Sequence, residues 1–289
     1  MANLKEIRLR IASVSSNMKI TQAMKMVSAS KFRHASAAIV KMRPYSEALS
    51  EILAQVSASL DSYDVNSPYT VVRREEKKML LVVVTSNKGL CGAFNANVVK
   101  FARHLLAEQF AGKSVDIVTI GTKGRDLLAR YCPIVADYSH IFDDLTFAAS
   151  AEISQKMMDD FAAGTYDRVQ IVYNRFKNAA TQILTSEEFL PLVLETGGKE
   201  SNTDFILEPD SKSIVEGLLP QSLRLQFFRI LRDSVASEHG ARMTAMSQAT
   251  DNAKALKELL TLQYNNARQA SITNQIIEIV SAAEALSGK

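Results

Sequence analysis

The sequence predicts an α/β protein in which a small, largely parallel sheet is inserted between two long helices. Residues 3–58 contain no glycine and a single proline, Pro44, and no proline follows Pro220. Few residues in either stretch can therefore interrupt a helix. The residues between these two stretches alternate short β-branched runs with amphipathic segments, which is typical of strand–helix units.

The N-terminal helix is expected from residue 3, with Asn3 as its cap, to about residue 58, with Pro44 as the place for a kink. Apolar and small residues recur at steps of three and four along its first part. This seam consists of Leu4, Ile7, Ile11, Val14, Met18 and Thr21. Such a spacing favours pairing with a second helix.

The C-terminal stretch carries the matching seam. If residues 220–286 are helical they span about 100 Å at ~1.5 Å per residue, too long for a small domain to bury throughout. The seam consists of Met243, Met246, Ala249 or Thr250, Ala253, Leu256, Leu260, Tyr264 and Ala267. We therefore expect the N- and C-terminal helices to form a long antiparallel two-helix coiled coil.

The end of the C-terminal helix has no partner in its own chain, because this helix is the longer of the two. Its apolar residues are Ile272, Ile276, Ile277, Ile279, Val280 and Leu286. Contiguous exposed apolar surface of this kind indicates a protein interface.

The inserted part is expected to be a Rossmann-like α/β domain with about five strands. Strands are predicted at 79–85, 115–120, 134–138, 168–173 and, at an edge, 180–190, with a last short strand at 205–207. Helices are predicted at 94–110, 121–131 and 145–162. The first strand is apolar throughout, which predicts burial on both faces. The predicted domains are 1–60 (N-terminal coiled-coil helix), 61–208 (α/β domain) and 209–289 (C-terminal coiled-coil helix).

Charge is unevenly distributed, although the net charge is only +3. Residues 1–43 carry nine Lys and Arg against one acid, Glu6. This pattern is compatible with an acidic or polyanionic partner, although a solvated helix face is the commoner explanation of such a pattern. The two cysteines form no CxxC pair and the four histidines no HxxxH pair, so no metal site is expected.

Motifs for catalysis are weak. The turn 121–124 (GTKG) follows a strand and opens a helix, so its amides are candidates for holding a phosphate or simply for forming a turn. The turn 89–92 has the same ambiguity, and Cys91 is a candidate nucleophile or a small buried residue. Glu238 and His239 are a candidate acid–base pair or an ordinary surface pair on a helix. No catalytic constellation and no cofactor are expected.

Several longer motifs resemble a known family. Residues 20–31 (ITQAMKMVSASK) with Arg43-Pro-Tyr45, 86–95 (SNKGLCGAFN), 237–246 (SEHGARMTAM), 249–253 (ATDNA), 264–273 (YNNARQASIT) and 278–280 (EIV) resemble the signatures of the gamma subunit of the bacterial F-type ATP synthase. The likeness covers essentially the whole chain. It departs at Gly240, where alanine is usual, and at Asn17-Met18, where a polar pair is common.

The resemblance implies a non-catalytic rotor subunit of the central stalk. Such a subunit transmits rotation between a proton-driven ring of c subunits and a hexamer of three alpha and three beta subunits, and it also binds the epsilon subunit. One copy per complex is expected, as a peripheral protein on the cytoplasmic face of the bacterial inner membrane. By resemblance, the partner-interface residues are Lys19, Ile20, Met24, Lys25, Val27, Arg268, Gln269, Thr273, Ile276, Ile277, Glu278 and Val280.

Two other functions remain open at this point. One is an α/β nucleotide-binding enzyme with a coiled-coil arm for oligomerisation, for which Lys123 in the 121–124 turn is the candidate phosphate ligand. The other is a basic coiled coil that binds nucleic acid through residues 5–43. The resemblance to a rotor subunit implies no nucleic-acid partner.

Overall fold

The computed structural model describes residues 4–58, 67–73, 76–192 and 211–288. The fold divides into two compact units. Unit 1 comprises residues 1–28 and 243–289, and unit 2 comprises residues 29–242. Two helices, α1 (Leu4–Ala58) and α5 (Ser211–Ser287), contribute residues to both units. The strand predicted at 205–207 lies outside the described residues.

Unit 1 is an antiparallel pair of helical segments. The Thr21 and Thr250 hydroxyls lie 2.8 Å apart, and four residues further along α1 Lys25 Nζ donates to Ser247 Oγ at 2.9 Å. Later residues of α1 thus meet earlier residues of α5, which confirms the predicted antiparallel pairing.

The seam of α5 differs from the prediction at one position. Between Ala253 and Leu260 the residue turned toward α1 is Lys257, which is half-buried, whereas Leu256 is 45% exposed. Steps of four and three residues must alternate to keep a seam on one side of a helix. After the three-residue step from Thr250 to Ala253, the next step is four and reaches Lys257. The prediction of Leu256 as a seam residue was therefore wrong.

Unit 2 contains a five-stranded sheet in the order β3-β2-β1-β4-β5. The strands are β1 (Lys78–Val84), β2 (Ser114–Ile120), β3 (Ile134–Asp137), β4 (Arg168–Phe176) and β5 (Gln182–Leu190). The first four are parallel and β5 is an antiparallel edge strand. The connecting helices are α2 (Phe94–Glu108), α3 (Thr122–Leu128), the short 3₁₀ helix η1 (Ser139–Phe142) and α4 (Phe147–Ala162). This arrangement confirms the predicted Rossmann-like sheet.

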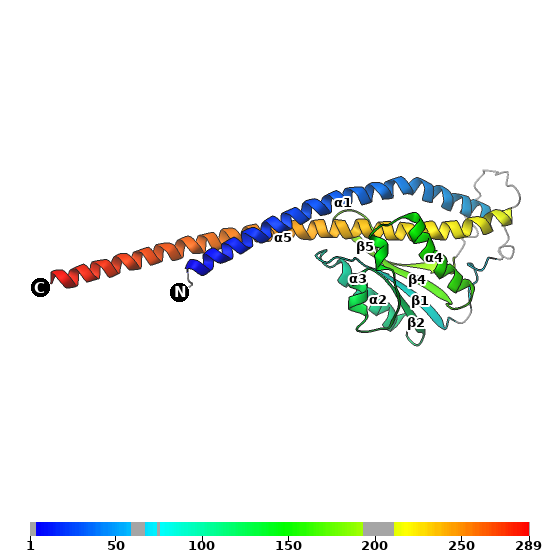
Figure 1. The fold of residues 1–289 in the computed structure, drawn as a ribbon. Coiled ribbons are helices and arrows are strands. Elements are labelled where there is room, and N and C mark those ends of the chain that lie inside the picture. Colours follow the sequence, from blue (N-terminus) through cyan, green and yellow to red (C-terminus); the bar gives the residue numbers. More distant parts are fainter. Residues whose placement is uncertain (1–3, 59–66, 74–75, 193–210, 289) are drawn as a thin grey trace. The chain divides into compact units, whose positions relative to one another are not determined.

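Helices cover both faces of the sheet, which explains why β1 is apolar throughout. Alternate residues of β1 face α2 and α3 on one side, through Met79, Leu81 and Val83. The intervening residues face α4 and the first part of α5 on the other side, and from α5 this core includes Phe227 and Ile230. Figure 1 shows α5 passing across this second face of the sheet in unit 2.

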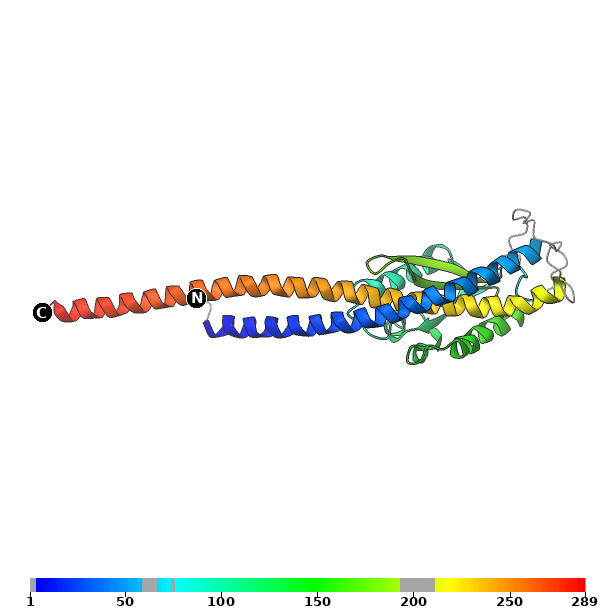
Figure 2. The same cartoon turned by 90° about the horizontal axis from the view of Figure 1, so that it is seen from above.

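The parts of α1 and α5 in unit 2 pack against each other as well as against the sheet. Ala35 and Ile39 contact Ala236, while Leu49 and Leu53 form a second cluster with residues of α5 near Val215. Figures 1 and 2 show the two helices side by side here. Pro44 lies inside α1 and Pro220 lies inside α5, and both helices are continuous through these positions. The helix α5 therefore begins before Pro220, at Ser211. None of the described helices has the length and apolar character needed to span a membrane.

Candidate functional site: the terminal helix pair and the glycine turns

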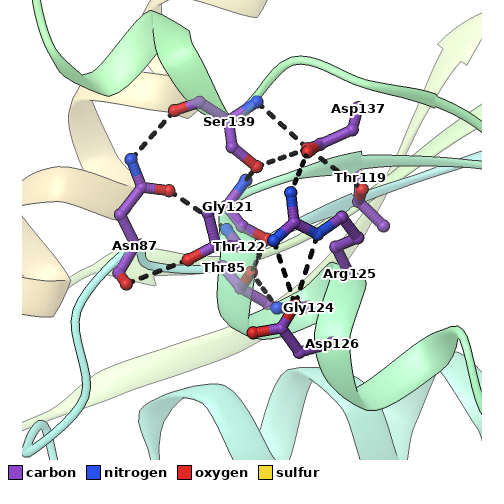
Figure 3. A network of polar contacts seen from close by, with 10 residues as sticks. All are labelled: Thr85, Asn87, Thr119, Gly121, Thr122, Gly124, Arg125, Asp126, Asp137 and Ser139. Atoms are coloured by element: carbon purple, nitrogen blue, oxygen red, sulfur yellow. Dashed lines mark hydrogen bonds and ion pairs between the residues drawn. The ribbon is translucent and has the colours of Figure 1, made fainter.

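The turn at Gly121 joins β2 to α3 and was the best candidate for a phosphate site. Its four amides already have protein acceptors. In order from residue 121 to 124 they donate to Ser139 Oγ (3.0 Å), Asn87 Oδ1 (3.0 Å), the Ser86 carbonyl (3.1 Å) and Thr85 Oγ1 (2.8 Å). Figure 3 shows three of these acceptor residues, Thr85, Asn87 and Ser139, around the turn. A phosphate here would have to displace internal hydrogen bonds, so the geometry favours a structural turn over a phosphate site.

The cation beside this turn is also engaged. Arg125 forms ion pairs with Asp126 at 3.1 Å and with Asp137 at 3.0 Å, and Asp137 accepts hydrogen bonds from the Ser139 hydroxyl and amide (Figure 3). The Ser139 and Arg125 hydrogen bonds outweigh burial and lower the pKa of Asp137. Each of these charged side chains is therefore already paired within the network.

Close packing explains the glycines of this motif. Gly121 has φ +117°, and a Cβ there would lie 2.3 Å from the Thr85 carbonyl oxygen. A Cβ on Gly124 would lie 2.6 Å from Thr85 Oγ1. Both glycines allow the β2–α3 turn to approach the end of β1, which is a structural requirement unrelated to ligand binding.

The loop after β1 is organised by an internal network. The Ser86 amide donates to Asn95 Oδ1 at 2.9 Å, and Asn95 Nδ2 donates to Ser86 Oγ at 2.8 Å and to Cys91 Sγ at 3.3 Å. Cys91 is only 2% exposed. As expected for a small buried residue, its sulfur packs inside the loop and is not presented as a nucleophile.

Arg242 of α5 holds the same loop from the outside. Its Nη2 donates to the Lys88 carbonyl at 2.7 Å and its Nε to the Gly89 carbonyl at 3.1 Å. Its Nη1 forms an ion pair with Glu238 at 2.7 Å, and both side chains are nearly buried. Ligands of open α/β sheets bind at the carboxyl ends of the strands, and in this chain an α5 side chain occupies that place beside β1.

Glu238 and His239 are not an ordinary surface pair, because both are half-buried. Burial raises the pKa of Glu238, and the Arg242 guanidinium partly offsets that effect. Burial and the Arg242 charge lower the pKa of His239 to about 4, so its ring is neutral at pH 7. His239 Nδ1 lies 3.4 Å from Arg242 Nη1, where a neutral ring accepts the hydrogen bond. Glu238 thus pairs with Arg242 and not with His239.

The residues predicted to meet partner subunits lie in unit 1, and all but one are exposed. Met24 is half-buried and faces the paired helix. Ile20 and Val27 are 54% and 58% exposed although they are apolar. The other exposed members are Lys19, Lys25, Arg268, Gln269, Thr273, Ile276, Ile277, Glu278 and Val280.

Beyond Ser271, every described side chain of α5 up to residue 286 is exposed. We call residues 272–286 the tip. Its apolar side chains are Ile272 (47% exposed), Ile276 (55%), Ile277 (56%), Ile279 (69%), Val280 (48%) and Leu286 (83%). The tip therefore presents an apolar surface that no described residue of unit 1 covers.

Comparison with known proteins agrees with the resemblance noted in the sequence. A family model described as ATP synthase matches residues 3–286. The gamma chain of Flavobacterium psychrophilum ATP synthase is 54% identical, and that of Geotalea uraniireducens is 41% identical, each over 100% of both chains.

Solved structures show the same fold. A chain in the central stalk/c-ring structure of the Tetrahymena thermophila mitochondrial ATP synthase matches with a TM-score of 0.59 and 25% identity, over 80% of this chain and 99% of that chain. A chain of the Euglena gracilis mitochondrial ATP synthase rotor matches with a TM-score of 0.63 and 20% identity, over 93% of this chain and 98% of that chain. The fold and the full-length relatives agree with the rotor role expected from the resemblance. The chain therefore belongs to the ATP synthase gamma chain family, whose members are the non-catalytic rotor subunit of the central stalk.

Proposed function

We propose that the helix pair of unit 1 transmits rotation by turning inside a hexamer of three alpha and three beta chains, with one copy of this chain per complex. The observation that carries the proposal is the tip, an apolar helix surface without a partner in its own unit. An apolar surface can turn inside an apolar collar because it forms no directional bonds that must break at each step.

Cationic side chains of α1 supply a second kind of contact. Arg8 and Lys19 are exposed, and among the described residues neither has an acidic partner. We propose that Lys19 and Lys25 face acidic segments of the beta chains, and that Arg268, Gln269 and Glu278 make polar contacts on α5. Exposed charges of this kind affect encounter and register more than affinity.

Unit 2 is proposed to bind the c ring and the epsilon subunit. The related chains of known structure come from assemblies described as central stalk with c-ring and as rotor. A buried core shared by the sheet, α4 and α5 suits a part that has to carry torque without deforming. We further propose that the chain is a peripheral protein on the cytoplasmic face of the bacterial inner membrane, and that its domains are 1–60, 61–208 and 209–289.

The experiment that tests the proposal is affinity purification of the tagged chain from detergent-solubilised membranes, with native mass spectrometry and an ATPase assay. We expect one copy of this chain with three alpha, three beta, an epsilon and a ring of c chains, in a complex that hydrolyses ATP. Recovery as a free dimer that binds nucleotide by itself would contradict the proposal.

Specific contacts are tested by cysteine cross-linking in the purified complex. Ile276→Cys on the tip is expected to cross-link to alpha or beta chains. Lys100→Cys on α2 is the matched control, because Lys100 is exposed and lies in unit 2. Equal cross-linking to alpha and beta chains from both positions would show that the tip has no special place in the hexamer.

A further inference from the structure

Unit 2 contains a cavity of about 840 Å³ between α1, the end of β4 and α5. Its size falls in the range of about 300–1,000 Å³ that is usual for sites of small ligands. Most of its walls come from three segments that are distant in sequence: residues 39–49 of α1, residues 175–177 at the end of β4 and just after it, and residues 222–233 of α5. Ile183 of β5 and Leu192 complete the lining. Figure 2 shows α1 and α5 side by side over this part of the unit.

Positive charge dominates the lining. Arg43 comes from α1, Arg175 and Lys177 from the end of β4, and Arg229 from α5. The acidic residues of the lining are Glu47 and Asp233. A concave surface lined with one sign of charge concentrates counter-ions, because the low-dielectric walls focus the field.

The cations differ in how far the protein already neutralises them. Arg229 is committed, because it lies 2.6 Å from Glu187, a carboxylate that also accepts hydrogen bonds from Tyr173 and Gln226. Arg43 has only a long, exposed contact of 3.9 Å with Glu47. Among the described residues no ion pair engages Arg175 or Lys177, and both are exposed.

We propose that this cavity is a binding site for a small phosphate-bearing anion, held by Arg43, Arg175 and Lys177. Guanidinium groups bind phosphate oxygens in a bidentate manner, and charge-assisted hydrogen bonds of this kind are roughly twice as strong as neutral ones. A bound anion would join α1 to the end of β4, so it would stabilise unit 2. The proposal does not depend on the rotor function.

Asp233 makes the site sensitive to pH. Its side chain is 9% exposed, and its ion pair with Arg229 is long at 4.0 Å. Burial raises its pKa to about 6, so its negative charge is present at pH 7.5 and largely lost at pH 5. While charged, it competes with an incoming anion. The ionisable groups that face it are Arg229 of α5, Glu187 of β5, Arg175 and Tyr173 of β4, and Arg43 of α1.

The first test is equilibrium dialysis of the full-length chain against radiolabelled inorganic phosphate, and separately against a phosphomonoester, glycerol 2-phosphate. Saturable binding of phosphate alone would indicate a site for the free ion, and tighter binding of the ester a site for a phosphorylated small molecule. The double variant Arg175→Gln, Lys177→Gln is expected to weaken binding about tenfold. Its matched control, Lys100→Gln with Arg130→Gln, removes the same charge from exposed positions of unit 2 and is expected to leave binding within about twofold.

A second variant tests whether the anion binds beside Asp233. Asp233→Asn is expected to bind phosphate about fivefold tighter than the unmodified chain at pH 7.5, and equally tightly at pH 5, because the unmodified chain carries the opposing charge of Asp233 only at the higher pH. Comparing the two proteins at one pH cancels the titration of phosphate itself. The proposal is overturned if the unmodified chain shows no saturable binding, if the control variant loses as much affinity as the cavity variant, or if Asp233→Asn binds no tighter at pH 7.5.

Discussion

The helix α5 lies in two different environments. In unit 2 it is part of a core, since Leu223, Phe227 and Ile230 are each 0% exposed. Among the described side chains of α5 in unit 1, Met246 and Leu260 are the only buried apolar ones, and those of the tip are all exposed. One continuous helix thus carries residues for internal stability in one unit and residues available to other chains in the other.

Substitutions in the two environments should separate these roles, and Phe227 should show the largest effect. Its ring packs 6.0 Å from that of Phe189 in the core between the sheet and α5. Phe227→Ala is expected to lower the free energy of unfolding by about 4 kcal/mol, because it leaves a cavity in a fully buried position. Urea denaturation of the full-length chain measures this.

The matched control for Phe227→Ala is Leu259→Ala in unit 1, where the side chain is 52% exposed. Its cost is expected to stay below about 0.5 kcal/mol. Similar losses at both positions would mean that α5 is equally embedded in the two units.

Arg242 marks the end of the part of α5 that belongs to unit 2. Arg242→Ala is expected to cost about 3 kcal/mol, because it leaves Glu238 as a buried charge and two loop carbonyls without their donor. Denaturation of Arg242→Ala, Glu238→Gln and the double variant gives a thermodynamic cycle. The double variant should recover part of the loss, and a strictly additive result would show that the two side chains do not interact.

His239 should make stability depend on pH. Its pKa in the fold is lowered to about 4, below the unfolded value of about 6.5, so between these pH values the unfolded chain binds more protons. Stability from this group is present above pH 6.5 and is lost as the pH falls toward 4. Asp233 has the opposite sign, because its raised pKa of about 6 stabilises the fold as the pH falls below 6.

A variant is needed to separate these opposing contributions. His239→Gln keeps an acceptor for Arg242 and removes the titration. Between pH 7 and pH 4 the unmodified chain should lose about 2 kcal/mol more than this variant, after allowance for the partly exposed ring. Parallel stability curves for the two proteins would contradict the assignment of a buried neutral ring.

Much of the fold could be predicted because it follows from local patterns. The apolar run of β1 reflects burial on both faces, and the scarcity of glycine and proline reflects the length of the helices. The wrong prediction of Leu256 as a seam residue also comes from a local pattern. A hydrophobicity pattern selects the apolar residue, whereas the seam follows the spacing of the helix and reaches Lys257, whose long aliphatic stem can cover a seam.

The contacts around the glycine turns and the cavity could not be predicted in this way. Arg242 donates hydrogen bonds to the carbonyls of Gly89 and Lys88, which lie 153 and 154 positions earlier in the chain. The Gly121 amide donates to the hydroxyl of Ser139, which follows β3 in the sequence. Neither pairing leaves a periodic signal. The family resemblance includes residues 86–95 and 237–246 among its motifs, but it did not indicate that these two segments contact each other.

The tip should show the smallest effect on stability. Ile277→Ala with Val280→Ala is expected to change the free energy of unfolding of the isolated chain by less than about 0.5 kcal/mol, because both side chains are about half exposed. If the tip contacts the alpha and beta chains as proposed, the same variant should weaken assembly or lower the ATP made per proton in membrane vesicles. Lys254→Ala, on an exposed part of α5 within the paired segment, serves as the control. Unchanged assembly and coupling in the tip variant would remove the tip from the mechanism while leaving the helix pair as the element that carries torque. A loss in both assays with no change in unfolding would show that this apolar surface is retained for contacts outside the chain.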